Sequence, residues 1–510
     1  METKTAAIEM RNITKRFGPV LANDKVWLNI YRGEILALLG ENGSGKTTLM
    51  NMLSGIYFPD EGEIKIDGKE VVIRSPKDAF DNGIGMIHQH FKLVDVLTAA
   101  ENIVLGLPGK LDLKAASAKI REICDKYGFS VDPAQKIYDM SVSQKQTVEI
   151  VKVLYRGADI LILDEPTAVL TPQETDKLFA VLRNMRNDGK AIVIITHKMH
   201  EVEALSDRVA ILRHGQFIGD MLTAHTNAQE MTNMMVGHAV SLNIERPDPV
   251  DPKPRIEVKG LTVRSVDGIV KLDDVSFTAN SGEILGIAGI SGCGQKELLE
   301  AIAGLQPTES GSICYVEDDG TREELLGKDP LRIAEMGVAL SFVPEDRLGM
   351  GLVGNMDLSD NMMLRSFRKG HGILTDRKAP RKLAETVVEE LDVNTPGVTT
   401  PVRRLSGGNV QKVLVGREIA SAPTVLLTAY AVRGLDINAS YTIYDLINRQ
   451  KERGVAVIYV GEDLDVLLEL ADRILVLCGG KVSGIVPGRG ATKRDVGMMM
   501  TQLGGNEAHA

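Results

Sequence analysis

A glycine-rich segment near the start of the chain has the residue types and spacing that bind a phosphate chain. It lies between the apolar stretch EILALL and the helix-compatible stretch TTLMNMLSGI. Glycines permit a turn whose amides converge on one anion, and the N-terminus of a following helix adds its dipole. We expect Lys46 to reach the terminal phosphates and Thr47 to ligate Mg²⁺. The predicted phosphate-binding residues are Gly40, Glu41, Asn42, Gly43, Ser44, Gly45, Lys46, Thr47 and Thr48.

Two carboxylates end an apolar run further along, in ILILDE at residues 160–165. An acid at the carboxyl end of a parallel strand faces the ligand crevice. Asp164 can hold Mg²⁺ through water, and Glu165 can polarise an attacking water as a general base. The alternative is a strand that merely ends in a polar turn, and the following Pro166-Thr167 is compatible with both.

A third apolar run, IIT, ends in His197. A lone histidine in this position more often has a structural role. Because His197 is here one of a set with Lys46, Asp164 and Glu165, we expect it to contact the γ-phosphate and the attacking water.

Size and composition limit the classes of protein. The 510 residues exceed one ordinary core, and the net charge of −10 disfavours a protein that grips nucleic acid. The four scattered cysteines contain no C-x-x-C pair, which fits reduced thiols. Since the chain contains no long apolar run and no secretory leader, we expect it neither to span a bilayer nor to be exported.

An internal repeat organises the chain. GEILALLGENGSGKTTLMNMLSGI at 33–56 matches GEILGIAGISGCGQKELLEAIAGL at 282–305. The predicted domains are residues 1–245 and 256–505, joined by the proline-rich linker RPDPVDPKPR at 246–255. Apolar strand-like runs alternate with helical stretches in both halves. This pattern predicts α/β domains with mostly parallel sheets.

From about residue 8 to residue 500 the motifs resemble those of ABC ATPases. The resemblance implies two tandem phosphate-loop domains, each with a mostly parallel sheet, an antiparallel β subdomain and a helical subdomain, the latter at 92–155 in the first half. ATP and Mg²⁺ are the implied cofactors. In this family an aromatic residue stacks on adenine, which corresponds to Phe17 in KRFG. A glutamine that contacts the metal and links to the membrane partner corresponds to Gln89, which thereby joins Thr47 and Asp164 in the implied Mg²⁺ set. The implied catalytic set is Glu165, His197, Lys46 and Gln89.

The family also carries a signature, L-S-G-G-Q, that closes over the ATP held by the other half. The second half has Leu405-Ser406-Gly407-Gly408-Asn409, so Ser406, Gly407 and Gly408 are implied to contact the ATP of the first half. The first half has Met140-Ser141-Val142-Ser143-Gln144, in which Ser143 replaces a glycine. A side chain there hinders close approach to phosphate.

The second phosphate loop, residues 289–296, is also altered. Gln295 stands at the lysine position, Lys296 at the hydroxyl position, and Ala429 and Tyr430 replace Asp164 and Glu165. The intact loop would thus meet the intact signature, and the altered loop the altered signature. We expect a head-to-tail pseudo-dimer with one hydrolytic site. The alternative, a second half that serves only as scaffold, stays open.

A fused pair with a degenerate second half resembles the importers of simple sugars and nucleosides, and IHQHF and YRGADILILDEPTAVLTPQE look closer to the nucleoside type. The resemblance implies two transmembrane permease subunits, an indirect solute-binding protein partner, no nucleic acid, and a peripheral location on the cytoplasmic face of the membrane. Segments 89–103 and 345–361 are the expected permease contacts. The rival hypothesis is a twin ATPase acting on ribosomes. Such proteins keep both sites and have a long charged linker, which this chain lacks.

Overall fold

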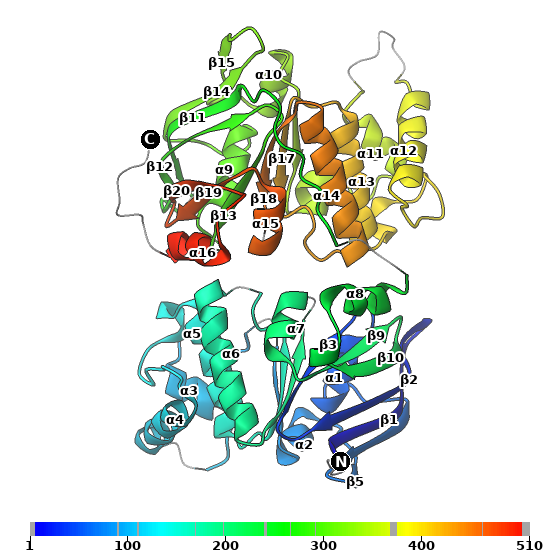
Figure 1. The fold of residues 1–510 in the computed structure, drawn as a ribbon, viewed down its shortest axis with the longest axis vertical. Coiled ribbons are helices and arrows are strands. Elements are labelled where there is room, and N and C mark those ends of the chain that lie inside the picture. Colours follow the sequence, from blue (N-terminus) through cyan, green and yellow to red (C-terminus); the bar gives the residue numbers. More distant parts are fainter. Residues whose placement is uncertain are drawn as a thin grey trace. The chain divides into compact units, whose positions relative to one another are not determined.

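The computed structural model describes residues 6–88, 91–109, 112–168, 170–196, 198–238, 242–265, 267–290, 292–367, 375–461 and 463–501. The chain divides into two compact units, residues 1–241 and 242–510, and each is described by itself (Figure 1). Among the described residues, no helix combines the length and the apolar composition needed to cross a membrane.

A six-stranded sheet forms the centre of the first unit. Its strands lie in the order β10 (Gln216–Leu222), β9 (Arg208–Arg213), β3 (Glu34–Leu39), β8 (Ala191–Ile195), β7 (Ile160–Asp164) and β6 (Ile84–Ile87). All neighbours from β9 to β6 pair in parallel, and β10 pairs antiparallel with β9. Every residue of β3, β8 and β7 is buried, as expected for a parallel sheet covered on both faces.

A second, antiparallel sheet packs against this centre. Its order is β2 (Val20–Tyr31), β1 (Ala6–Phe17), β4 (Glu61–Ile66) and β5 (Lys69–Val71). Ile8 of β1, Leu36 of β3 and Leu49 of α1 (Lys46–Leu53) are fully buried in one shared apolar cluster. This cluster fixes α1, and with it the loop that precedes α1, between the two sheets.

The remaining helices of the first unit cover the central sheet or form a separate group. Figure 1 shows α3 (Ala99–Val104), α4 (Leu113–Tyr127) and α5 (Val142–Tyr155) on the side away from β1 and β2. Ile103, Ile120 and Val148 join these three helices in a cluster of their own. The other helices are α2 (Pro76–Asp81), α6 (Pro172–Asn187), α7 (Met199–Leu205) and α8 (Ala228–Val236), with short 3₁₀ turns at Ile137–Asp139 and Thr223–His225.

The second unit repeats this arrangement strand for strand. Its central sheet has the order β16 (Leu340–Val343), β17 (Val425–Ala429), β18 (Ala456–Val460), β13 (Ile284–Gly289), β19 (Arg473–Cys478) and β20 (Lys481–Pro487). Its antiparallel sheet has the order β12 (Val270–Asn280), β11 (Pro254–Arg264), β14 (Ser310–Val316) and β15 (Arg322–Glu324).

Its helices are α9 (Gln295–Ile302), α10 (Pro330–Glu335), α11 (Leu358–Met363), α12 (Lys378–Glu390), α13 (Gly407–Ala420), α14 (Ile437–Glu452), α15 (Leu464–Leu470) and α16 (Lys493–Thr501), with short helical turns at Arg347–Gly351 and Val402–Arg404. The predicted fold class, two duplicated α/β domains with antiparallel and helical subdomains, is confirmed.

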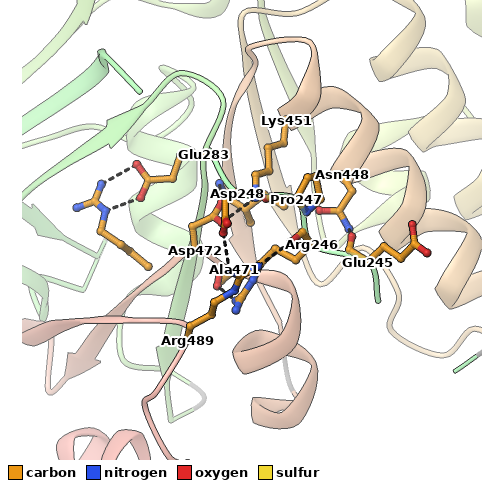
Figure 2. A network of polar contacts seen from close by, with 12 residues as sticks. Glu245, Arg246, Pro247, Asp248, Glu283, Asn448, Lys451, Ala471, Asp472 and Arg489 are labelled. Atoms are coloured by element: carbon orange, nitrogen blue, oxygen red, sulfur yellow. Dashed lines mark hydrogen bonds and ion pairs between the residues drawn. The ribbon is translucent and has the colours of Figure 1, made fainter. Parts of the chain in front are cut away.

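Residues at the start of the proline-rich segment belong to the second unit and contact its helices and strands (Figure 2). Asn448 Nδ2 donates to the Glu245 carbonyl at 2.7 Å, and Arg489 pairs with Asp248 at 2.7 Å. Lys451 donates both to the Pro247 carbonyl and, at 2.7 Å, to the Asp472 carboxylate. The Lys451 side chain is 2% exposed, so this ion pair is buried beneath the segment.

Candidate functional site

The predicted site residues of the first unit follow three neighbouring strands. β8 lies between β3 and β7 in the sheet, and all three run in parallel. Their carboxyl ends therefore meet at one edge, where β3 leads into the glycine-rich loop and β7 ends at Asp164. This is the edge at which ligands bind in open α/β sheets.

Glycine is sterically required at two positions of this loop. Gly40 has φ 155°, and a Cβ there would lie 2.3 Å from the Leu212 carbonyl oxygen. Gly45 has φ 94° and precedes the first turn of α1, where a Cβ would lie 2.3 Å from the Ala22 carbonyl oxygen. Glu41, Asn42, Gly43 and Ser44 complete the loop between them, and Lys46, Thr47 and Thr48 form the first turn of α1. The first amides of a helix have no partner within that helix and can receive an anion.

Lys46 is enclosed within this loop. Its Nζ donates to the carbonyl of Gly40 at 2.6 Å and to that of Glu41 at 2.9 Å. Burial lowers the pKa of the Lys46 ammonium, and the carboxylates of Glu165, Asp164 and Glu41 act against this shift. The ammonium is thus held over the loop as a positive charge that is poorly solvated and available to phosphate oxygens.

The hydroxyl of Thr47 meets the carboxylate of Asp164, its Oγ1 lying 3.3 Å from Oδ2. Burial raises the pKa of Asp164, the charge of Glu165 raises it further, and the Thr47 hydrogen bond and Lys46 oppose the rise. A cation between these oxygens would offset the cost of burying the charged carboxylate. Hard oxygen donors of this kind suit Mg²⁺, so the two residues fit the metal that the sequence predicts. Within the described residues, Ser44 Oγ in the same loop is buried and lacks a hydrogen-bond partner.

Glu165 has a left-handed backbone conformation, φ 46°, which a residue with a side chain seldom adopts. Its amide donates to the Ile195 carbonyl of β8 at 2.9 Å, which ties the turn after β7 to the neighbouring strand. Tyr430, the matching residue of the second unit, has φ 52° and donates to Val460 at 2.9 Å. The left-handed conformation is therefore kept at this position in both units, although the side chain there differs. Such strain is concentrated at functional sites.

Phe17 lies at the end of β1 and is 41% exposed. Its ring meets Tyr57 edge-on, with centroids 5.1 Å apart. Sequence reasoning missed Tyr57, whose only signal is an aromatic residue shortly after α1. Gln89 and His197, the other two predicted residues of this half, lie outside the described residues.

The matching loop of the second unit has a similar backbone but lacks the positive charge that Lys46 provides in the first unit. Gln295 is 3% exposed, and its Nε2 donates to the Ile290 carbonyl at 3.2 Å, as Lys46 does to Glu41. Lys296 turns outward, 52% exposed, and lies 3.8 Å from Glu300. The amide thus replaces the structural bonds of a lysine without offering a cation to phosphate.

The two signature segments both cap a helix but present different surfaces. Ser406 caps α13, its Oγ accepting from the Asn409 amide at 3.4 Å and from Asn409 Nδ2 at 2.9 Å. Ser406 and Gly407 are exposed and Gly408 is half-buried, so the backbone of this turn is open to a ligand. Ser141 caps α5 in the same way, but the Ser143 hydroxyl lies 3.2 Å from the Ser141 hydroxyl and occupies the corresponding surface.

Arg347 supports the signature of the second unit. Its Nη1 donates to the Gly407 carbonyl at 3.2 Å, and its Nη2 donates to the Arg433 carbonyl. Arg433 in turn pairs with Glu345 and lies over the Tyr430 ring, 5.9 Å from its centroid. The segment around 345–347 is thus fastened both to the signature turn and to the loop after β17.

Comparisons with known proteins give matches over both halves of the chain. A family model described as "ABC transporter" matches residues 23–168 and 272–428. The nucleoside import ATP-binding protein NupA of Lactococcus lactis subsp. cremoris is 43% identical over 507 residues, covering 98% of each chain. The guanosine import ATP-binding protein NupO of Bacillus subtilis is 41% identical and covers 97% of each chain. The ribose import ATP-binding protein RbsA 1 of Rubrobacter xylanophilus is 38% identical, covering 98% of this chain and 99% of its own.

Proposed function

This chain belongs to the ABC transporter family as an ATPase subunit with two fused ATP-binding domains, and we propose that it energises the import of nucleosides or related simple sugars through a single hydrolytic site. The observation that carries the proposal is the cluster of Lys46, Thr47 and Asp164, in which the hydroxyl and carboxylate lie 3.3 Å apart. Gln295, Lys296 and Ala429 stand in these places in the second half.

In the proposed site, the loop amides and Lys46 hold the phosphates of ATP. Thr47 and Asp164, with Gln89, would hold Mg²⁺, which supplies charge neutralisation to the phosphate oxygens when bound. Glu165 orients and deprotonates the attacking water, and His197 contacts that water and the γ-phosphate. Phe17 stacks on the adenine.

The signature turn of the second half completes this site in the proposal. Ser406, Gly407 and Gly408 would donate to the γ-phosphate from the exposed N-terminus of α13. The Ser143 hydroxyl hinders the same approach by the first-half signature. This difference supports one hydrolytic site rather than two.

The names of the relatives support the transport role. The relatives of highest identity reported above act on nucleosides and guanosine by name, and a ribose relative follows at 38%. We therefore favour nucleosides over simple sugars as the transported solute. We also favour a transport role over a role on ribosomes. Two transmembrane permeases and, through them, a solute-binding protein are the proposed partners. The chain would lie on the cytoplasmic face of the membrane, attached through the permeases.

The proposal predicts that Glu165→Gln in the full chain lowers ATP turnover by at least ~100-fold, because it removes the base, while ATP binding is retained. Phosphate release and equilibrium binding of labelled ATP measure the two effects. Tyr430→Ala is the matched control, since Tyr430 occupies the same turn in the other half, and it should keep turnover within about twofold. Loss of turnover in Tyr430→Ala together with full turnover in Glu165→Gln would reverse the assignment.

The solute is tested separately, by uptake. Cells that lack this chain should lose uptake of labelled nucleosides, and the wild-type gene should restore it where Glu165→Gln does not. Unchanged nucleoside uptake with loss of ribose uptake would move the assignment to simple sugars.

A further inference from the structure

A buried carboxylate on α7 connects the loops that follow β7 and β8. The side chain of Glu201 is 4% exposed. Its Oε1 accepts from Thr167 Oγ1 at 2.5 Å, and its Oε2 accepts from Thr196 Oγ1 at 3.3 Å. Lys198 Nζ lies 3.2 Å from Oε1 and donates to the Thr167 carbonyl at 3.4 Å.

The residues held by Glu201 are close in sequence to the proposed catalytic groups. Thr167 follows Glu165 by two positions, and Thr196 directly precedes His197. Both threonines are 3% exposed, so their hydroxyls have little access to water. One carboxylate therefore fixes the spacing between the chain segments that carry the proposed base and the proposed histidine.

The second half has the same fold without this network. Val432, Gly461, Asp463 and Val466 stand at the positions of Thr167, Thr196, Lys198 and Glu201. Val432 and Val466 pack against the apolar core there. Apolar contacts thus suffice to fold these loops, and a buried charge is costly unless it is fully paired. The network is present in the half that also has Glu165.

We propose that Glu201 is a positioning residue for ATP hydrolysis, which sets the separation of the Glu165 and His197 segments so that both groups act on one water. The inference rests on the proposed function, in which Glu165 and His197 act together. Displacement of a reacting group by about 1 Å can lower a rate by ~100-fold, so a network of this kind affects the chemical step more than binding.

The test uses the full chain, two test variants and one control variant. The double variant Thr167→Val with Glu201→Val installs two of the four second-half residues, the pair that packs against the apolar core there, and its Tm checks the folded state. Its kcat for ATP should fall roughly 10- to 100-fold, with KM and the affinity for labelled ATP within about twofold and Tm nearly unchanged. Glu201→Gln keeps the shape of the side chain and one accepting oxygen. Its kcat should lie between that of the wild type and that of the double variant. Glu203→Gln, an exposed change on the same helix, is the control.

Three outcomes would overturn the inference. They are a wild-type kcat in the double variant, a raised KM with unchanged kcat, and loss of the folded state in Glu201→Gln, since the last would make Glu201 a stability residue. Failure of the proposed function gives a different result: Glu165→Gln would then hydrolyse ATP normally in the same assay.

Discussion

Lys46 and Gln295 occupy the same place in the two phosphate loops, and their contacts show what a charge adds to a loop that is otherwise alike. Lys46 donates hydrogen bonds to two loop carbonyls, and Gln295 donates one to the Ile290 carbonyl. Both residues tie the loop to the start of its helix. Only an ammonium can also neutralise a phosphate charge, because an amide offers hydrogen bonds without net charge.

We expect Lys46→Ala to abolish measurable ATP turnover and to weaken ATP binding by at least ~10-fold, since one charge-assisted contact contributes about 1.5–3 kcal/mol. The matched change, Lys296→Ala, removes a half-exposed lysine next to Glu300 and should leave both quantities unchanged. Isothermal titration with ATP and phosphate release report the two effects. Robust turnover by Lys46→Ala would place hydrolysis elsewhere.

At the scale of elements, the N-terminus of α13 is held by a residue from outside the signature. A Cβ at Gly407 would lie 3.2 Å from Arg347 Nη1, so glycine also makes room for this arginine. In the first half Val142 stands at the position of Gly407, so the space that glycine leaves for the arginine is absent there. The arginine thus accompanies the signature that is proposed to act on ATP.

Arg347→Ala should lower ATP turnover roughly 5- to 20-fold, because the signature turn loses a hydrogen bond from a charged group. ATP affinity at the first-half loop should change little. Arg381→Ala removes another arginine of the second half, one paired with Glu385 on the surface of α12, and should have no effect. Equal turnover in the two variants would argue that α13 does not depend on Arg347.

The sequence predicts those elements whose formation depends on a local residue pattern. Continuous apolar runs predict β3, β7 and β8 because a parallel sheet buries both faces, and the Lys46–Thr47 geometry follows from the spacing of the loop itself. The contacts of Arg347 and Glu201 are different. Arg347 reaches a carbonyl 60 residues away, and Glu201 reaches Thr167 across 34 residues. Neither contact has a periodicity that a sequence pattern could show, since each depends on the packed positions of separate elements.

At the scale of the whole molecule, an ion pair occurs at matching positions of the two halves but is buried to different depths. Lys451 and Asp472 are 2% and 10% exposed, beneath the proline-rich segment. Their counterparts in the first half, Arg186 and Asp207, are 27% and 38% exposed. A proline-rich composition predicts a spacer, and it gives no signal that residues 245–248 are fastened within the second unit (Figure 2).

This difference predicts unequal effects on stability. Lys451→Met should destabilise the second unit by about 3–5 kcal/mol, because it leaves the Asp472 carboxylate buried without its cation. Arg186→Met should cost the first unit about 1 kcal/mol or less, since its ion pair is partly solvated. Urea unfolding of the full chain, followed by a probe in each unit, measures both changes. Equal losses would show that the segment does not protect the Lys451 pair.

The anchoring of the proline-rich segment also shortens the tether between the units. Helix α8 ends at Val236, and Ile244 is already buried in the core of the second unit. A polypeptide advances at most ~3.6 Å per residue, so these two residues stay within roughly 30 Å of each other. Short tethers produce effective concentrations on the order of millimolar. If the two ATPase halves associate as proposed, their association is intramolecular, and ATP turnover per chain should be the same in dilute and in concentrated protein.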